Sequence, residues 1–470
     1  ATRSLGELVG LLGHIDASNG AYYLLMHGWT SLFGDSLISL RIPSVLAMAG
    51  AAAFVALTAE RLFDSRVTAV CAGLLLAVVP QISHYAQEIR AYALVTCAVA
   101  AATYFLLRAL ERPGLRWWAP YCVAMTLAGA WHLVSFTTVA GQLALVLPHL
   151  WRTRAAMDRR LLWQYPVAIV VAVLPVLPVA LIGSRQSGRQ LGWIPKPATA
   201  DLVSIAYPLF GTEQVAKAFA LLALAALVLS ARRTWALQAL LLAELPVVAV
   251  WLMSQGDTSY FIDRYMLFTV PAWAVLAGGG VGAAFRLVAA LAGRPWAPGR
   301  IVSPRLALPV AGVVAVGLIA YPAMKALPTQ RSIRHVGSHT GSHEPFRAAA
   351  DAITAGYRPG DGLAAPTGDQ SWAMVWPGVS YYLPPDVRPS PVFVARSAED
   401  AEELTPEPCP QPASCLGDGP RLWLIVLGDT WDPLAAVPQD QAQVLRDHYG
   451  APGQVTPLGG LTVALLDRNT

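Results

Sequence analysis

Apolar stretches long enough to cross a bilayer follow one another along the first 330 residues. A helical span needs about 20 predominantly apolar residues. Such stretches lie at residues 38–60, 67–86, 91–110, 117–132, 134–150, 162–183, 215–231, 234–253, 265–287 and 305–327. Polar and charged residues gather in the loops between them. The pattern predicts a multispanning α-helical membrane protein over residues 1–330, with about ten spans.

The pattern changes after residue 330. Residues 346–357 have the spacing of an amphipathic helix, and the sequence Arg-Pro-Gly-Asp that follows is typical of a turn. Residues 422–427 and 461–466 are short apolar runs of the kind that form buried strands. Residues 331–470 are therefore expected to form a small soluble α/β domain.

The loop charges predict an orientation in the membrane. Arginine is concentrated in one alternating set of loops, which the positive-inside rule assigns to the cytoplasm: residues 61–66, 108–116, 152–160, 232–233 and 286–305. The other set lies outside and comprises residues 1–37, 84–90, 184–214, 254–264 and the C-terminal domain. Residue 1 then falls outside the membrane, and we expect a further span upstream of it. Residues 21–33 are apolar but too short to cross, which favours an interfacial or re-entrant helix.

Composition supports a membrane protein. Of 470 residues, 55% are hydrophobic and 13% are charged, whereas a soluble globular domain carries about 25% charged residues. The formal net charge of +4 requires no nucleic-acid partner. Abundant Ala, Gly and Pro with few lysines favour a bacterial source, and hence the bacterial cytoplasmic membrane.

The five cysteines fall into two groups. Cys71, Cys97 and Cys122 lie inside apolar runs and are expected to be packing residues. Cys409 and Cys415 lie close together in the polar sequence PCPQPASC, whose spacing does not match a zinc site. A local disulfide is expected there if this segment is extracytoplasmic.

The segment PQISHYAQEIRAYAL, residues 80–94, places an unusual number of polar groups between two apolar runs. An ionisable group near membrane depth is costly and indicates function by default. The candidate residues are Tyr85, Gln87, Glu88, Arg90 and Tyr92. The alternative is structural, with Arg90 extended to the interface and paired with Glu88.

The other external loops hold further candidates. They are His14 and Asp16 in the first loop, Lys196 in the third, and Arg264 and Tyr265 at the mouth of a span. Arginine matches phosphate geometry, a carboxylate can take a proton from a hydroxyl, and aromatic rings stack on sugars and prenyl chains. A phosphate-bearing lipid substrate would use all three.

Structural alternatives remain for several of these residues. Asp16 could cap the helix that follows it, and Arg264 could pair with the adjacent Asp263. His132 is expected to be a satisfied core group, and Arg41 an interfacial anchor. We identify no set of metal ligands, although a requirement for a divalent metal stays open.

Three segments resemble GT-C-type membrane glycosyltransferases, in particular the bacterial family 39 and mannosyltransferase-like proteins. The first is YYLLMHGWTSLFGDSLISLRIPSVLA, the second is SHYAQEIRAYAL, and the third is DRYMLFTVPAWAVLAG. The second is the most specific. The soluble domain after the last span also fits this family.

The resemblance implies transfer of a sugar from a polyprenyl-phosphate donor to a glycan, lipid or protein acceptor outside the cytoplasmic membrane. Family members hold a catalytic Asp, often followed by Glu, early in the first external loop. This chain has no such pair there, so the main carboxylate is expected upstream of residue 1, with Asp16 assisting or substituting. Mannose is the sugar that the resemblance favours, and arabinose-type sugars remain open.

The expected mechanism is a single inverting displacement. A carboxylate of the first loop deprotonates the acceptor hydroxyl, and Arg90 and Arg264 balance the charge of the departing polyprenyl phosphate. A transporter or flippase of lipid-linked sugars would also need arginines near a phosphate. A non-catalytic membrane scaffold is the third hypothesis.

Overall fold

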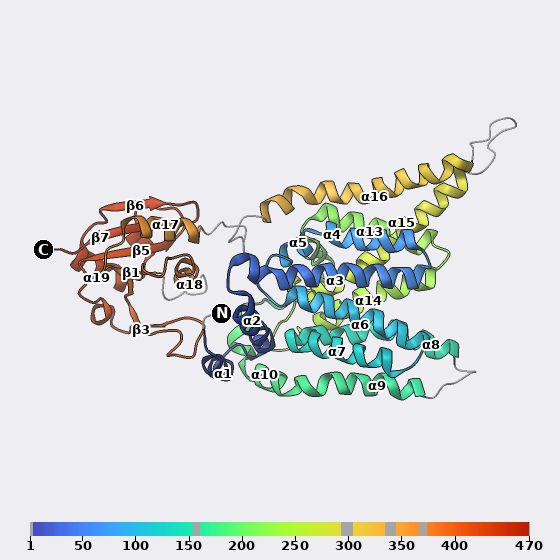
Figure 1. Ribbon diagram of the computed structural model, residues 1–470, viewed down its shortest axis with the longest axis horizontal. Helices are drawn as coiled ribbons and strands as arrows, with labels where there is room; N and C mark the ends of the chain where they lie inside the picture. Colours follow the sequence, from blue (N-terminus) through green and yellow to red (C-terminus); the bar gives the residue numbers. More distant parts are fainter. Residues whose placement is uncertain (1–2, 154–159, 293–303, 334–344, 366–373, 470) are drawn as a thin grey trace. The chain divides into compact units, whose positions relative to one another are not determined.

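The computed structural model describes residues 3–153, 160–292, 304–333, 345–365 and 374–469 (Figure 1). They form two compact units. One contains residues 16–332, and the other contains residues 3–15 together with the C-terminal segment from residue 333. The C-terminal unit thus includes a segment from the start of the chain, which the sequence pattern had not indicated.

Every regular element that the structure describes in the first unit is a helix. Its N-terminal part comprises η1 (Ala17–Asn19), α2 (Gly20–Phe33), α3 (Leu37–Phe63), α4 (Arg66–Val78), α5 (Pro80–Tyr85), α6 (Tyr92–Glu111), α7 (Leu115–Trp131) and η2 (Leu133–Thr137). Next come α8 (Thr138–Thr153), α9 (Arg160–Val173), η3 (Leu174–Val176), α10 (Leu177–Leu191), α11 (Asp201–Ser204) and α12 (Ala206–Phe210). The last elements are α13 (Glu213–Leu229), α14 (Arg233–Met253), η4 (Asp263–Thr269), α15 (Val270–Ala292) and α16 (Pro304–Ile333).

The described residues contain seven helices that are long and apolar enough to cross a membrane. An eighth arises if the segments Asp201–Phe210 and Glu213–Leu229, bent by 109°, count as one span. Ten spans were expected, which is more than the number of helices long enough to cross. If the bent pair counts as the eighth span, the two expected spans that are too short are α4, with 13 residues, and α7, with 17. At about 1.5 Å per residue, α4 is about 20 Å long, and the hydrocarbon core is about 30 Å thick.

Glycines of α15 allow its neighbours to approach closely. The long helices run roughly parallel to one another (Figure 1), and α15 packs among α13, α4 and α3. A Cβ added at Gly280 would lie 1.9 Å from the carbonyl oxygen of Leu222, and one added at Gly278 would lie 2.6 Å from Cβ of Ala72. Small residues are the usual means by which membrane helices pack backbone to backbone.

The C-terminal unit is a small α/β domain. Its sheet has the strand order β2-β1-β5-β7-β6, formed by β1 (Gly362–Ala364), β2 (Ser390–Pro391), β5 (Arg421–Leu427), β6 (Gln454–Pro457) and β7 (Leu461–Asp467). β1 is parallel to β2 and β5, whereas β7 is antiparallel to β5 and β6. The strands predicted at 422–427 and 461–466 are confirmed as β5 and β7. Both are buried on two faces, which explains their continuous apolar runs.

Helices cover both faces of this sheet (Figure 1). α17 (Phe346–Gly356), which was predicted, and α18 (Val375–Ser380) belong to one core, and α19 (Gln439–Tyr449) belongs to the other. The remaining elements are β3 (Val394–Arg396), β4 (Glu407–Pro408), η6 (Pro412–Cys415) and η7 (Pro433–Ala436). Asp361 is 1% exposed and accepts hydrogen bonds from Arg421 and Trp423, so the turn before β1 is tied to β5.

The N-terminal helix α1 (Leu5–His14) contacts residues 398–403 of this domain. Arg3 donates to the carbonyl oxygens of Ala398 and Glu403, and His14 Nδ1 lies 2.9 Å from Oε2 of Glu402. A Cβ at Gly10 would lie 2.3 Å from Oε1 of Glu402, so the Glu402 side chain would have to shift to admit a larger residue.

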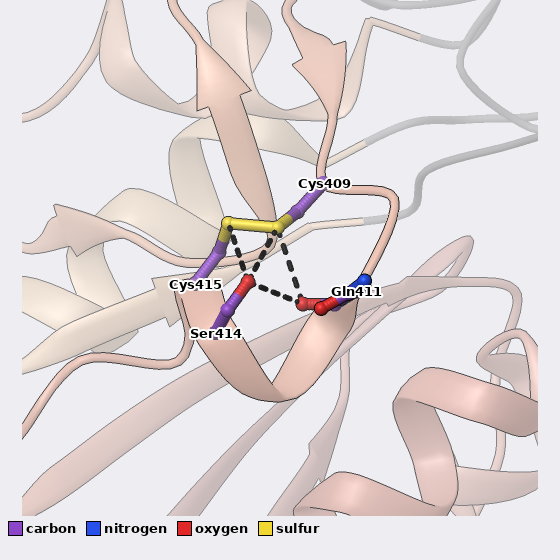
Figure 2. The surroundings of a disulfide bond; sticks show 4 residues. All are labelled: Cys409, Gln411, Ser414 and Cys415. Atoms are coloured by element: carbon purple, nitrogen blue, oxygen red, sulfur yellow. Dashed lines mark hydrogen bonds between the residues drawn. A yellow bond between two sulfur atoms is a disulfide. The ribbon is translucent and has the colours of Figure 1, made fainter.

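The expected disulfide is present. Cys409 and Cys415 are bonded across η6, and Ser414 Oγ lies 3.5 Å from Cys409 Sγ while donating a hydrogen bond to the carbonyl oxygen of Gln411 (Figure 2). Cys71, Cys97 and Cys122 are free thiols in the helical unit, as predicted.

Candidate functional site

The polar segment between α4 and α6 owes its shape to Pro80. A proline disfavours helical geometry in the residue before it and supplies no N–H to the preceding turn. Val79 is accordingly extended (φ −66°, ψ 121°), and α5 starts afresh with Pro80 at its first position. Residues 86–91 then form turns before α6 begins at Tyr92. The predicted polar cluster thus lies at the junction of three helices.

Side chains from three other segments hold this junction. Gln330 of α16 donates to the carbonyl oxygen of Val78 (3.0 Å) and to Ser83 (3.1 Å). Ser44 of α3 donates to the carbonyl oxygen of Glu88 (2.9 Å). From the junction itself, Gln81 donates to the carbonyl oxygen of Pro208 and to Oδ2 of Asp263. The backbone that carries Glu88 and Arg90 is therefore fixed by contacts distant in sequence.

Arg90 is loosely paired with Glu88. Nε of Arg90 lies 3.9 Å from Oε1 of Glu88, and His84 Nε2 lies 3.4 Å from the other carboxylate oxygen. The Arg90 side chain is 53% exposed and that of Glu88 is 14% exposed. The distance is longer than a hydrogen bond, so Glu88 leaves the donors of Arg90 available for a ligand.

The groups around Arg90 keep it charged. Burial acts to lower the pKa of Arg90, but Tyr92, Glu88, Tyr23 and Asp16 outweigh that effect, and the pKa is raised. Asp16 and Tyr23 come from the first loop and α2, so these segments lie within electrostatic range of the Arg90 guanidinium.

Asp16 is a buried carboxylate with side-chain donors on both oxygens. It is 8% exposed and adopts a left-handed backbone conformation (φ 64°). Tyr23 donates its hydroxyl hydrogen to Oδ2, and Asn19 donates to Oδ1 (2.6 Å). Its carboxylate does not cap η1, so the capping interpretation is wrong. Burial, followed by the nearby Asp16 carboxylate, raises the pKa of Tyr23, so Tyr23 remains a hydrogen-bond donor.

The segment that contains α10 also reaches the first loop. The helix continues to Leu191, so the loop expected to begin at residue 184 starts later. Gln186 accepts a hydrogen bond from the backbone N–H of Ala17 (2.9 Å), and Gln190 Nε2 lies 3.5 Å from Oδ1 of Asp16. This segment therefore contacts the backbone and the side chain of the first loop.

Arg264 lies against aromatic rings instead of a carboxylate. Its guanidinium carbon is 5.0 Å from the ring centre of Trp193 and 5.8 Å from that of Tyr265. Its Nε is buried and has no hydrogen-bond partner among the described residues. Asp263 accepts a hydrogen bond from Gln81, and the described part of the chain shows no ion pair between Asp263 and Arg264. The ion-pair alternative for this residue is wrong.

A cluster of aromatic rings joins the segments of Arg90 and Arg264. Ring centres are 5.1 Å apart for Tyr85 and Tyr92, 6.3 Å for Tyr92 and Tyr265, and 4.5 Å for His132 and Tyr265. His132, which was expected to be satisfied, has a buried Nδ1 with no partner among the described residues. Tyr85 also lies within electrostatic range of Glu88 and Arg264.

A small, mainly apolar cavity lies beside η4. Its lining includes Phe268 and Thr269, at the end of η4, together with side chains of α3, α6, α8, α14 and α15. The chain therefore offers polar donors at one end of η4 and an apolar space at the other.

The remaining candidates lie apart from these contacts. Gln87 donates to the carbonyl oxygen of Ser83, one turn back in the chain. Lys196 is exposed in the segment after α10. His14 belongs to the C-terminal unit and contacts Glu402, although only one residue separates it from Asp16. The described residues contain no group of three His, Cys, Asp or Glu side chains able to hold a metal ion.

Sequence reasoning gave no role to five side chains that the structure brings to the site: Asn19, Tyr22, Tyr23, Gln190 and Trp193. The signals available were the aromatic pair at positions 22 and 23, in the first resembling segment, and the positions of Asn19 and Trp193 in the polar loops. Gln190 had no signal, because its role depends on where α10 ends.

Comparisons with known proteins bear on the family and the fold of this chain. Residues 21–182 match the family model described as dolichyl-phosphate-mannose-protein mannosyltransferase. That range includes the first two resembling segments and excludes the third. A search of curated protein sequences finds no match.

Among solved structures, ArnT of Cupriavidus metallidurans in the apo state aligns with a TM-score of 0.54 at 17% identity, over 93% of this chain and 85% of that chain. The oligosaccharyltransferase of Archaeoglobus fulgidus gives 0.48 at 12%, over 93% and 63%. The arabinosyltransferase EmbB of Mycobacterium smegmatis gives 0.39 at 14%, over 69% and 37%. The last two likenesses are too distant to carry an argument. This protein is thus a multispanning α-helical membrane protein with the fold of the GT-C-type membrane glycosyltransferases, and its residues 21–182 carry the mannosyltransferase family match.

Proposed function

We propose that this protein is an integral membrane glycosyltransferase that moves a sugar from a polyprenyl-phosphate donor to an extracytoplasmic acceptor. The observation that carries the proposal is the convergence of Asp16, Arg90 and Arg264, from three separate external segments, around one group of aromatic rings. The family match over residues 21–182 supports the same reaction class.

The two arginines suit the phosphate of such a donor. Arg90 has only a long contact to Glu88, and Arg264 keeps a buried Nε without a partner in the described chain. Leaving a buried polar atom such as Arg264 Nε without a partner is costly. A ligand phosphate would accept hydrogen bonds from this nitrogen and from the exposed guanidinium of Arg90.

Asp16 is the carboxylate we assign to the acceptor. Each carboxylate oxygen has two lone pairs, so the hydrogen bonds from Tyr23 and Asn19 leave acceptor capacity. Asp16 takes the hydroxyl proton as the acceptor oxygen bonds to the anomeric carbon. The bond from that carbon to the phosphate oxygen breaks, and the polyprenyl phosphate leaves with the electron pair, opposite Arg90 and Arg264. A single displacement inverts the anomeric configuration.

Mannose is the sugar we propose, since the matched family model is described as a mannosyltransferase. The acceptor is a glycan, a lipid or a protein. Tyr85, Tyr92 and Tyr265 position the donor. The end of α10 and the segment after it close the site through Gln190 and Trp193.

The site and the C-terminal domain are proposed to lie outside the bacterial cytoplasmic membrane. The arginine-rich loops favour this orientation. The disulfide between Cys409 and Cys415 also supports it, since disulfides persist in oxidising compartments.

The test is an Arg90→Ala variant assayed for transfer from radiolabelled polyprenyl-phosphate mannose in proteoliposomes. We expect a loss of at least about 100-fold in turnover, typical of removing a group that stabilises developing charge. Arg112→Ala is the matched control, because this arginine lies at the opposite end of α6. Near-normal transfer by Arg90→Ala would overturn the assignment. Movement of the donor across the bilayer without any transfer by the wild-type protein would favour a transporter.

A further inference from the structure

Tyr22 and Tyr23 are neighbours on α2 with different hydrogen bonding. Tyr23 donates its hydroxyl hydrogen to Asp16. Tyr22 is 4% exposed, and its hydroxyl is buried without a hydrogen-bond partner among the described residues. The ring centres are 6.4 Å apart, so the two hydroxyl groups belong to the same region of the unit.

An unpaired buried hydroxyl is unusual and costly. Most buried polar side-chain atoms are hydrogen-bonded, and leaving one unpaired costs about 1–3 kcal/mol. Two other buried tyrosines of this unit obey the rule, since Tyr121 and Tyr165 both donate to Oε1 of Gln142, at 2.6 and 3.2 Å. The exception at Tyr22 therefore calls for a partner from outside the chain.

The charges that face Tyr22 indicate which partner. Arg90 and Glu88 are the charged groups within electrostatic range of its hydroxyl. Burial raises the pKa of Tyr22, only partly offset by Arg90, so the hydroxyl keeps its proton at neutral pH and can donate. A neutral donor next to a guanidinium with free donors complements an oxyanion.

We propose that the Tyr22 hydroxyl donates a hydrogen bond to a phosphate oxygen of the lipid-linked donor, next to Arg90. This inference rests on the proposed function and adds a substrate-contacting group to that site. Tyr22 would also distinguish a phosphate-bearing lipid from the free polyprenol, which offers no oxyanion.

The experiment compares wild-type protein with Tyr22→Phe, both as full chains in lipid nanodiscs. Binding of a C55 polyprenyl phosphate and of the matching C55 polyprenol is measured, with inorganic phosphate as a third probe. Thermal stability without ligand is measured alongside. Because Phe removes an unpaired hydroxyl, we expect unchanged or higher thermal stability together with about a tenfold rise in Kd for the polyprenyl phosphate. Affinity for the polyprenol should not change.

Tyr121→Phe is the control. It leaves Gln142 without the hydroxyl of Tyr121, so its thermal stability should fall while its Kd for the polyprenyl phosphate stays at the wild-type value. The opposite pattern in the two variants separates a ligand contact from a structural role.

Four outcomes would overturn the inference, and they are distinguishable from one another. Equal Kd values of wild type and Tyr22→Phe for the polyprenyl phosphate would show that Tyr22 makes no contact with it, while the proposed function would still hold. An equal loss of affinity for polyprenyl phosphate and for polyprenol would show that the Tyr22 hydroxyl does not bind the phosphate. Failure of the wild-type protein to bind polyprenyl phosphate overturns both proposals. If inorganic phosphate alone shows the tenfold difference, the site recognises free phosphate and the lipid source is wrong.

Discussion

At the scale of single residues, the site depends on which polar groups satisfy one another. Asp16 is held by Tyr23 and Asn19, and Arg90 has only a long contact to Glu88. Arg264 lies over the Trp193 ring with an unpaired Nε in the described chain. The carboxylate is thus oriented by neutral donors, while the two guanidinium groups keep capacity for an anion.

An Asp16→Asn variant tests the carboxylate. The amide keeps nearly the same shape and still accepts a hydrogen bond from Tyr23, but it cannot take a proton at neutral pH. We expect transfer to fall by about 100-fold or more, with little change in donor binding. The assay is single-turnover transfer at saturating donor.

Asp257→Asn is the control for this prediction, because Asp257 is exposed in the segment after α14. Its turnover should equal that of the wild type. Turnover of Asp16→Asn within a few-fold of wild type would show that another carboxylate serves as the base.

At the scale of elements, two features set the positions of the site segments. Pro80 divides the predicted span at 67–86 into α4 and α5. Residues 86–91 then form turns instead of continuing a helix. Glycines of α15 allow α13 and α4 to pack closely against α15, which directly follows η4. Since η4 carries Arg264 and Tyr265, packing of α15 also places these residues.

Gly280→Ala tests the close packing of α15. A Cβ there would lie 1.9 Å from the backbone carbonyl of Leu222, so α13 or α15 must move. We expect a loss of roughly 1–3 kcal/mol in stability, the usual cost of overpacking, seen as a lower melting temperature in detergent.

Gly312→Ala on α16 is the matched substitution, because no atom lies within 4 Å of its added Cβ. Alanine is the better helix former by about 1 kcal/mol, so the melting temperature should stay or rise. A similar fall for both variants would mean that helix propensity, not packing, dominates.

At the scale of the whole molecule, the chain combines a helical membrane unit with a small α/β unit that also includes α1. The orientation of both rests on the arginine-rich loops and on the disulfide of the C-terminal unit.

Cysteine labelling of intact cells tests this orientation. Trp431, in the C-terminal unit, is 77% exposed, and Arg233, at the start of α14, is also exposed. A membrane-impermeant maleimide should label Trp431→Cys and leave Arg233→Cys unlabelled until the cells are opened. If only Arg233→Cys were labelled in intact cells, the protein would have the opposite orientation in the membrane.

Local pattern was enough wherever neighbouring residues determine the structure. The apolar runs predicted the helices, residues 21–33 form α2, and α17, β5 and β7 lie where the tail pattern placed them. The disulfide joins residues six positions apart, so it too was accessible from sequence. α1 was missed, although its capping box of Ser4 and Glu7 is a recognisable helix start.

The sequence by itself determined that this is a multispanning membrane protein whose polar segments cluster between spans, because hydrophobicity and charge are local properties. Only the tertiary structure decided which of those polar groups meet. Gln190 reaches Asp16 across 174 positions, and Trp193 contacts Arg264 only because of where α10 ends and how η4 packs. His14 and Asp16, nearly adjacent in the chain, belong to different compact units. Such pairings follow from helix packing, which depends on all the helices at once.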